Sequence, residues 1–109
     1  VVYKRQDYSN SKEAIREAEL DISEGTDIIM VKPGLPYLDI ISKLNQKFDI
    51  PIFAYQVSGE YSMIMNAINN GLLDRSVILE TLTSFKRAGC SGILTYFAPI
   101  VSKILNEDK

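Results

Sequence analysis

The sequence predicts an α/β fold built around a parallel sheet. Three short apolar runs, at residues 27–31, 50–55 and 92–96, are continuous, as in strands that are buried on both faces. The segments between them keep apolar residues at helical spacing, with Gly or Pro at most of the junctions. Strands that alternate with helices are typical of βαβ units, whose crossovers are right-handed. We therefore expect parallel strands whose carboxyl ends lie along one rim.

The first half of the chain supplies two helices and a strand. A helix is expected at residues 10–24, because Asn10 or Ser11 can cap it. The strand at 27–31 follows, and Pro36 suits the first turn of the next helix. The apolar faces of these helices comprise Ala14, Ile15, Ala18 and Ile22, and then Tyr37, Ile41, Leu44 and Phe48. Both helices are therefore amphipathic and can cover a sheet.

The second half of the chain continues the alternation. In order, we expect a strand at 50–55, a helix at 60–70, a helix from Asp74 to Gly89, a strand at 92–96 and a short helix at 99–105. Asp74 is a typical N-cap, and glycines such as Gly71 and Gly89 commonly end helices. The length of 109 residues is enough for one modest domain.

Composition and charge exclude several classes of function. Twelve basic residues oppose fourteen acidic ones, and the basic stretch "YKR" is too short for a nucleic-acid surface. No apolar run is long enough to span a membrane, so no membrane partner is expected. The single cysteine, Cys90, cannot form an internal disulfide, which indicates a reducing, cytoplasmic compartment. The chain has no histidine, which excludes a Ser-His triad and a histidine metal ligand within it.

A lysine, a serine and a tyrosine follow the three predicted strands. Ligands of parallel α/β folds bind beyond the carboxyl ends of the strands, which is where Lys32, Ser58 and Tyr96 stand. Desolvation at the end of a buried strand favours a neutral amine, a nucleophile that forms Schiff bases with carbonyls. The hydroxyl of Ser58 and the helix start after it suit a carboxylate or a phosphate. Each residue also has a structural interpretation: Lys32 reaching solvent, Ser58 as an N-cap, and Tyr96 as a core residue.

Three longer motifs resemble one known family. The stretches "MVKPGLPYLDII", "YQVSGEYSMI" and "SFKRAG…ILTYFA" are similar, in order and spacing, to the C-terminal part of the porphobilinogen synthase family, also called δ-aminolevulinic acid dehydratase. The resemblance runs from about residue 11 to residue 105. It implies that residues 1–109 are about three βα units from the C-terminal part of a TIM (β/α)8 barrel, a fold that needs about 250 residues.

The resemblance implies a hydro-lyase of tetrapyrrole and haem biosynthesis. Members of the family condense two molecules of 5-aminolevulinate to porphobilinogen with loss of water, and they form homo-oligomers, typically octamers. Lys32 then matches the lysine that forms the Schiff base with the first substrate. Ser58 and Tyr96 match the residues that hold the carboxylate of that substrate. Glu17 matches a glutamate near which many bacterial members bind an allosteric magnesium ion.

The resemblance also implies active-site residues that lie outside the 109 residues of this chain. A second active-site lysine and the active-site metal ligands, for magnesium or zinc, correspond to positions upstream of Val1. In "VVYKRQDY", Arg5 and Gln6 both stay open as the counterpart of an arginine that contacts the second substrate. We therefore expect the 109 residues alone to be inactive.

Two alternatives to this enzyme remain open. One is a truncated, non-catalytic half-barrel that only folds or associates. The other is a class I aldolase-like Schiff-base enzyme on the same fold. The stretches "VSGEY" and "TYF" favour the porphobilinogen synthase interpretation, because aldolase chemistry does not call for them.

Overall fold

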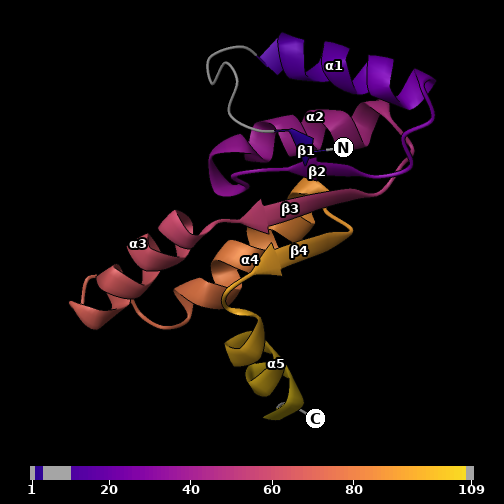
Figure 1. Ribbon diagram of the computed structural model, residues 1–109. Helices are drawn as coiled ribbons and strands as arrows, with labels where there is room; N and C mark the ends of the chain where they lie inside the picture. The colour runs from indigo at the N-terminus through magenta and orange to yellow at the C-terminus, as the bar shows by residue number, and fades with distance from the viewer. Residues whose placement is uncertain (1, 4–10, 108–109) are drawn as a thin grey trace.

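The computed structural model describes the backbone of residues 2–3 and 11–107 and the side chains of residues 12–106. Arg5 and Gln6 therefore lie outside the described residues. Four parallel strands form one sheet in the order β1-β2-β3-β4 (Figure 1). Their bounds are Val2–Tyr3 for β1, Ile29–Val31 for β2, Ile52–Gln56 for β3 and Gly92–Thr95 for β4. Each strand pairs with the next one along the chain, as in the wall of a barrel.

Helices connect the strands, as the sequence predicts. Their bounds are Ser11–Ser23 for α1, Leu35–Tyr37 for the short 3-10 helix η1, Leu38–Lys47 for α2, Ser58–Asn69 for α3, Val77–Ala88 for α4 and Ala98–Glu107 for α5. The three predicted strands are present, and β1 is a further strand that the sequence analysis did not predict. The helix expected from Asp74 begins later, because Ser76 is its N-cap. The N–H of Ser76 donates to Oδ2 of Asp74 at 3.2 Å, so Asp74 shapes the turn before the helix.

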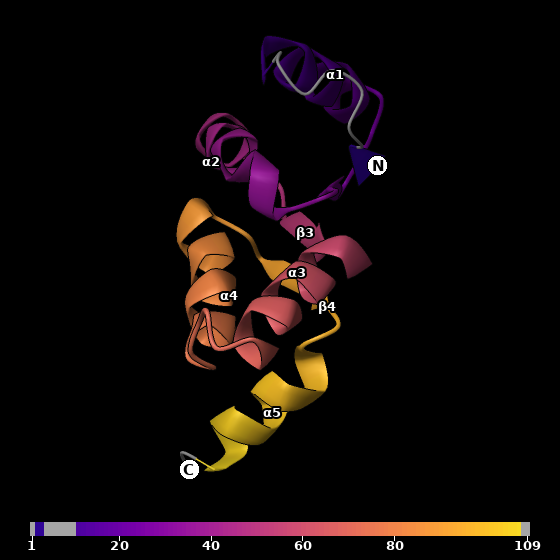
Figure 2. The same cartoon turned by 90° about the vertical axis from the view of Figure 1, so that its left-hand side faces the viewer.

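The helices α2 and α4 cover one face of the sheet. Figure 2 shows them side by side on the same side of the strands. Side chains of a strand alternate between the two faces, and every second residue of β2 and β3 is buried. The buried core on this covered face comprises Ile29, Val31, Ile52 and Ala54 from the strands and Ile41, Leu44, Ile78, Leu82 and Phe85 from the helices.

The opposite face of the sheet, called the open face below, holds the other half of the same alternation. It comprises Met30, Lys32, Phe53, Tyr55, Leu94 and Tyr96. The side chain of Leu94 is 45% exposed, so no element of the described chain covers this part of the face. In a closed TIM barrel the corresponding face is turned to the interior. The predicted rim therefore lies where the open face meets the carboxyl ends of β2, β3 and β4.

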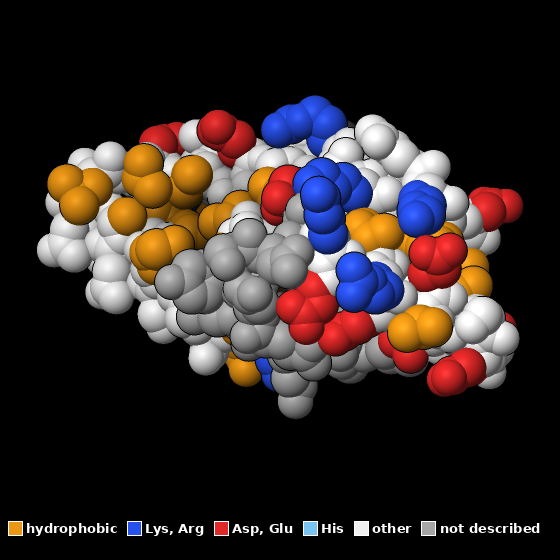
Figure 3. Space-filling model, turned by 90° about the horizontal axis from the view of Figure 1, so that it is seen from above, with side chains coloured by type: hydrophobic (Ala, Val, Ile, Leu, Met, Phe, Trp, Pro, Cys, Tyr) orange, Lys and Arg blue, Asp and Glu red, His pale blue; other side chains and the backbone are white. Residues whose placement is uncertain are grey.

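Charged side chains of both signs are mixed on the surface around α1. Figure 3 shows Lys and Arg interspersed with Asp and Glu over the right-hand part of this view, while hydrophobic side chains gather at the left. Lys47 of α2 and Glu19 of α1 form an ion pair, with Nζ and Oε2 3.5 Å apart. Across the described residues, no helix combines the length and the apolar character needed to cross a membrane.

Candidate active site

Lys32 lies directly after β2 on the open face. Its Nζ is 5.1 Å from the centroid of the Tyr55 ring, which belongs to β3. The ring quadrupole of a tyrosine attracts a cation placed above its face. The Lys32 side chain is half-buried, and its peptide bond to Pro33 is cis. The contact with Tyr55 therefore holds the amine at the carboxyl end of the sheet.

Tyr96 stands one residue beyond β4, and 53% of it is exposed. Its hydrogen bond with Tyr55 raises the pKa of Tyr96 above the ordinary value, and the positive charge of Lys32 opposes that rise. The phenol is therefore protonated at neutral pH, and its one hydrogen can turn from Tyr55 to an anion that binds here. A hollow of about 230 Å³ lies here, lined by Tyr55, Leu94, Thr95 and Tyr96. Three neighbouring strands thus bring Lys32, Tyr55 and Tyr96 together.

Replacing Tyr55 by Phe tests this network. Without the Tyr55 hydroxyl, the protonated phenol of Tyr96 loses its partner. Tyr55→Phe should therefore lower the pKa of Tyr96 toward the ordinary tyrosine value of about 10. The titration is followed by ¹³C NMR of ring-labelled tyrosine, with the Tyr96 signal assigned from Tyr96→Phe. Tyr37→Phe changes a largely buried tyrosine elsewhere and serves as the control. An unchanged Tyr96 pKa in Tyr55→Phe would contradict the hydrogen bond.

Ser58 is the first residue of α3, and its side chain is exposed. The N-cap is Val57, with an extended backbone (φ −74°, ψ 167°), so the interpretation of Ser58 as an N-cap is wrong. One turn later the Tyr61 ring packs against Tyr96, with ring centroids 5.7 Å apart, and against Phe97, at 4.6 Å. These contacts tie the start of α3 to the end of β4, and Ser58 and Tyr96 therefore lie on the same rim.

The loop after Lys32 packs tightly against β3 and α4. The N–H of Gly34 donates to the carbonyl oxygen of Tyr55 at 3.0 Å. A Cβ atom at Gly34 would lie 2.9 Å from Cζ of Phe85 and 3.3 Å from Cβ of Ala54. The backbone of Gly34 has right-handed helical angles (φ −79°, ψ −51°) that any residue adopts. The close approach of Phe85 is therefore the reason for glycine at this position.

Glu60 connects this loop to the start of α3. Its Oε1 accepts the N–H of Leu35 at 2.8 Å, and its Oε2 accepts the N–H of Val57 at 3.1 Å. Burial raises the pKa of the Glu60 carboxyl, and the two backbone N–H groups act in the opposite direction. Glu60, Tyr55 and Tyr61 are parts of the site that the sequence does not predict. The only signal for Glu60 was its place three residues after the N-cap, where a capping box has an acid.

Two residues singled out in the sequence lie away from the rim. Cys90 is half-buried and packs against the core, and burial raises the pKa of its thiol to about 11, which disfavours the reactive thiolate. Glu17 lies on α1, which packs against α2. Within the part of the chain that the structure describes, no group of three or more Cys, Asp and Glu side chains is arranged to hold a metal ion.

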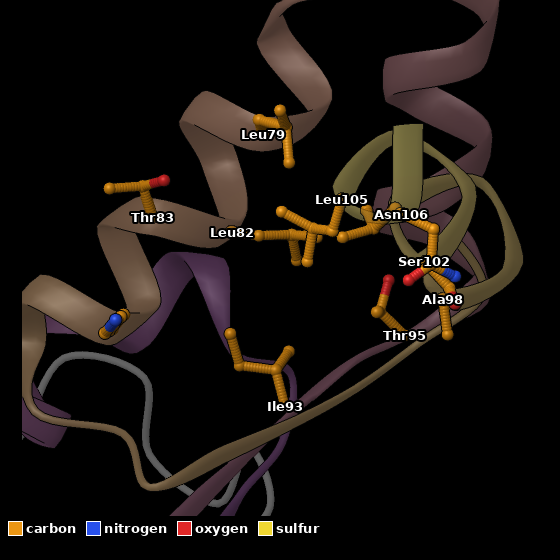
Figure 4. Close-up of a pocket in the computed structure, with 11 residues that line it drawn as sticks. Leu79, Leu82, Thr83, Ile93, Thr95, Ala98, Ser102, Leu105 and Asn106 are labelled. Carbon is orange, nitrogen blue, oxygen red and sulfur yellow. The ribbon is translucent and has the colours of Figure 1, made fainter. Parts of the chain in front are cut away.

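A larger hollow, of about 800 Å³, runs along β4 between α4 and α5. Figure 4 shows Leu79 and Leu82 of α4, Ile93 of β4 and Leu105 of α5 around it. Apolar side chains dominate the lining, and Lys86 is its one charged residue. This composition suits packing rather than chemistry. We therefore assign the reactive groups to the rim at Lys32.

The fold and the rim together define a class of protein. A parallel α/β segment with polar and reactive side chains at the carboxyl ends of successive strands is typical of enzymes built on a TIM barrel. The family described as "Delta-aminolevulinic acid dehydratase" matches residues 2–104. The chain belongs to this family.

Relatives from distant organisms agree on this family. The chain is 54% identical to the delta-aminolevulinic acid dehydratase of Rhodobacter capsulatus over 98 residues, which are 89% of this chain and 30% of the relative. It is 54% identical to that of Archaeoglobus fulgidus over 101 residues, 93% of this chain and 31% of the relative. The chain thus spans about 30% of the length of these relatives.

A solved structure supports the same assignment. The delta-aminolevulinic acid dehydratase (porphobilinogen synthase) of Toxoplasma gondii ME49, in complex with the reaction product porphobilinogen, matches with a TM-score of 0.92 and 50% identity. The match covers 95% of this chain and 30% of the Toxoplasma chain. The predicted fold class, an α/β segment from the C-terminal part of a TIM barrel, is confirmed.

Proposed function

We propose that the whole protein to which this segment belongs is a porphobilinogen synthase. It condenses two molecules of 5-aminolevulinate to porphobilinogen with loss of water. The observation that carries the proposal is the Lys32 amine, held beside Tyr55 and Tyr96 at the strand ends of a chain from this family. The Toxoplasma relative, bound to porphobilinogen, supports the choice of product. The second active-site lysine of the family corresponds to residues outside this chain, so the 109 residues alone should not form porphobilinogen.

Lys32 is the nucleophile in this proposal. Its neutral amine adds to the C4 ketone of 5-aminolevulinate, and a C–N bond forms. The ketone oxygen then leaves as water with the two amine hydrogens, which leaves the C=N bond of a Schiff base. Tyr96 and Ser58 donate hydrogen bonds from their hydroxyls to the substrate carboxylate. This anchorage fixes how far the ketone carbon lies from Nζ of Lys32.

The two anchoring hydroxyls provide the test of this arrangement. A hydrogen bond to a charged group contributes about 1.5–3 kcal/mol, which corresponds to a factor of about ten or more in an equilibrium constant. Ser58→Ala and Tyr96→Phe in the whole protein should each raise KM for 5-aminolevulinate by about tenfold or more. The control is Ser62→Ala, which changes an exposed serine one turn further along α3. A wild-type KM in both rim variants would refute the carboxylate site.

We further propose that Glu17 marks an allosteric magnesium site. Magnesium binds through one or two carboxylates and keeps several waters, so a single glutamate on a helix suits it. The described residues do not form a complete cage for magnesium or zinc. Metal ions are used in this family. We also propose that the whole protein forms a homo-oligomer, as the resemblance to the family implies.

The magnesium site is tested by the response of the whole protein to added Mg²⁺. Glu17→Gln removes the carboxylate charge, so it should abolish the magnesium stimulation and leave the basal rate of turnover. The matched control is Glu24→Gln, which changes an exposed glutamate directly after α1. Magnesium should stimulate this variant as much as it stimulates the wild type. A Glu17→Gln variant that magnesium still stimulates would eliminate this site.

A further inference from the structure

Glu60 is a buried carboxylate at the rim that the proposed reaction does not use. It is 6% exposed, and Gln56 is the other buried polar side chain among the described residues. Burying a carboxylate is costly unless hydrogen bonds satisfy it. Both oxygens of Glu60 are satisfied, one by the N–H of Leu35 and one by the N–H of Val57. The position of this side chain is therefore set by two backbone segments at once.

The two hydrogen bonds are of different kinds. The bond to Val57 joins the third residue of a helix to its N-cap, which is the ordinary half of a capping box. The bond to Leu35 spans 25 residues of sequence and is the shorter of the two, at 2.8 Å. A helix cap has no need of this second bond or of the burial that comes with it. The bond to Leu35 therefore calls for a separate explanation.

The bond to Leu35 joins the two loops that carry the proposed reactive groups. Leu35 ends the short loop that begins at Lys32, and Gly34 fixes that loop to β3 through the carbonyl oxygen of Tyr55. Val57 immediately precedes Ser58. One carboxylate thus connects the loop of the amine to the loop of the hydroxyl, at the carboxyl ends of neighbouring strands.

We propose that Glu60 is a positioning residue for Schiff-base formation, which sets the separation between the Lys32 amine and the Ser58 hydroxyl. The inference rests on the proposed function. The substrate carboxylate is held at one end of this span and the ketone is attacked at the other. A displacement of about 1 Å between such groups lowers the rate of a reaction by up to about a hundredfold. Glu60 itself touches neither the substrate nor the reacting atoms.

Two substitutions in the whole protein test the positioning role. Glu60→Gln keeps the shape of the side chain but turns one N–H acceptor into a donor, so one loop loses its bond. Glu60→Asp keeps the charge but is one methylene shorter and cannot reach both N–H groups. Glu80→Gln, the same change on an exposed residue of α4, is the control. The measured quantity is the rate constant for trapping the 5-aminolevulinate adduct on Lys32 with borohydride at saturating substrate, because a rate constant does not depend on the folded fraction of the sample.

Both Glu60 variants should trap the adduct about 10- to 100-fold more slowly than the wild type, and Glu80→Gln should trap it at the wild-type rate. Saturating substrate should not restore the rate, so kcat falls as well as kcat/KM. A wild-type rate constant in Glu60→Gln or in Glu60→Asp would overturn the positioning role alone. A wild-type protein that forms no adduct on Lys32 would overturn the proposed function, and this inference with it.

Discussion

Lys32→Arg is expected to lower porphobilinogen formation by the whole protein by more than about a thousandfold. The guanidinium keeps a positive charge near the ring of Tyr55, where the Lys32 amine lies 5.1 Å from the centroid. It does not lose its proton in proteins, so it cannot add to a ketone. The substitution therefore retains the charge and removes the nucleophile. Initial rates are measured over a range of 5-aminolevulinate concentrations with a colorimetric assay for porphobilinogen.

Lys47→Arg is the matched control for this experiment. Lys47 lies on α2, with about half of its side chain exposed, and pairs with Glu19 away from the rim. It should keep the wild-type rate. A Lys32→Arg enzyme as active as Lys47→Arg would show that the amine is not the nucleophile.

Gly34→Ala should destabilise the whole protein by about 1–3 kcal/mol, the usual cost of overpacking a core. The new methyl group would meet the ring of the fully buried Phe85, with Cζ only 2.9 Å away. The backbone angles at this position suit alanine, so the clash is the only source of the cost. The measurement is the midpoint of thermal unfolding, followed by circular dichroism. The variant should show a lower midpoint, and a lower rate of turnover because the loop begins at Lys32.

Two further variants control for this interpretation. Gly59→Ala places the same methyl group where no atom lies within 4 Å, inside α3, so the unfolding midpoint should not fall. Phe85→Leu makes room beside Gly34, and the loss in Gly34→Ala/Phe85→Leu should be smaller than the sum of the two single losses. Strict additivity would contradict the contact between these two positions.

The sequence predicts most of the fold because its helices are amphipathic and its strands are continuous apolar runs. The apolar runs become β2, β3 and β4, and the helical segments become α1 to α5. The strand β1 has only two residues, Val2 and Tyr3, and it is a strand solely because it pairs with β2. Such a pairing is a long-range contact that local patterns do not contain. The start of α4 differs for a local reason: Asp74 and Ser76 are both residues that favour N-caps, and Asp74 accepts the N–H of Ser76 in the turn before the helix.

The site could be predicted only where a polar residue interrupts a pattern. Lys32 and Tyr96 stand at the ends of apolar runs, where ligands of parallel α/β folds bind. Tyr55 is the last residue of the apolar run at 50–55 and looks like a core residue. Its place between the other two depends on strand register, in which Tyr55 pairs with Leu94. Glu60 shows the same limit, since its spacing predicts the bond to Val57 but not the bond to Leu35.

In the proposed reaction, the amine at the end of β2 forms the Schiff base. The most direct test is to incubate the whole protein with 5-aminolevulinate, reduce it with borohydride, digest it and locate the added mass by tandem mass spectrometry. Reduction converts the C=N bond to a stable secondary amine, so the substrate stays on the residue that bound it. We expect the adduct on the peptide that contains "MVKPGLPYLDII", at Lys32, and no adduct in Lys32→Arg. An adduct on any other lysine, with Lys32 unmodified, would contradict the account.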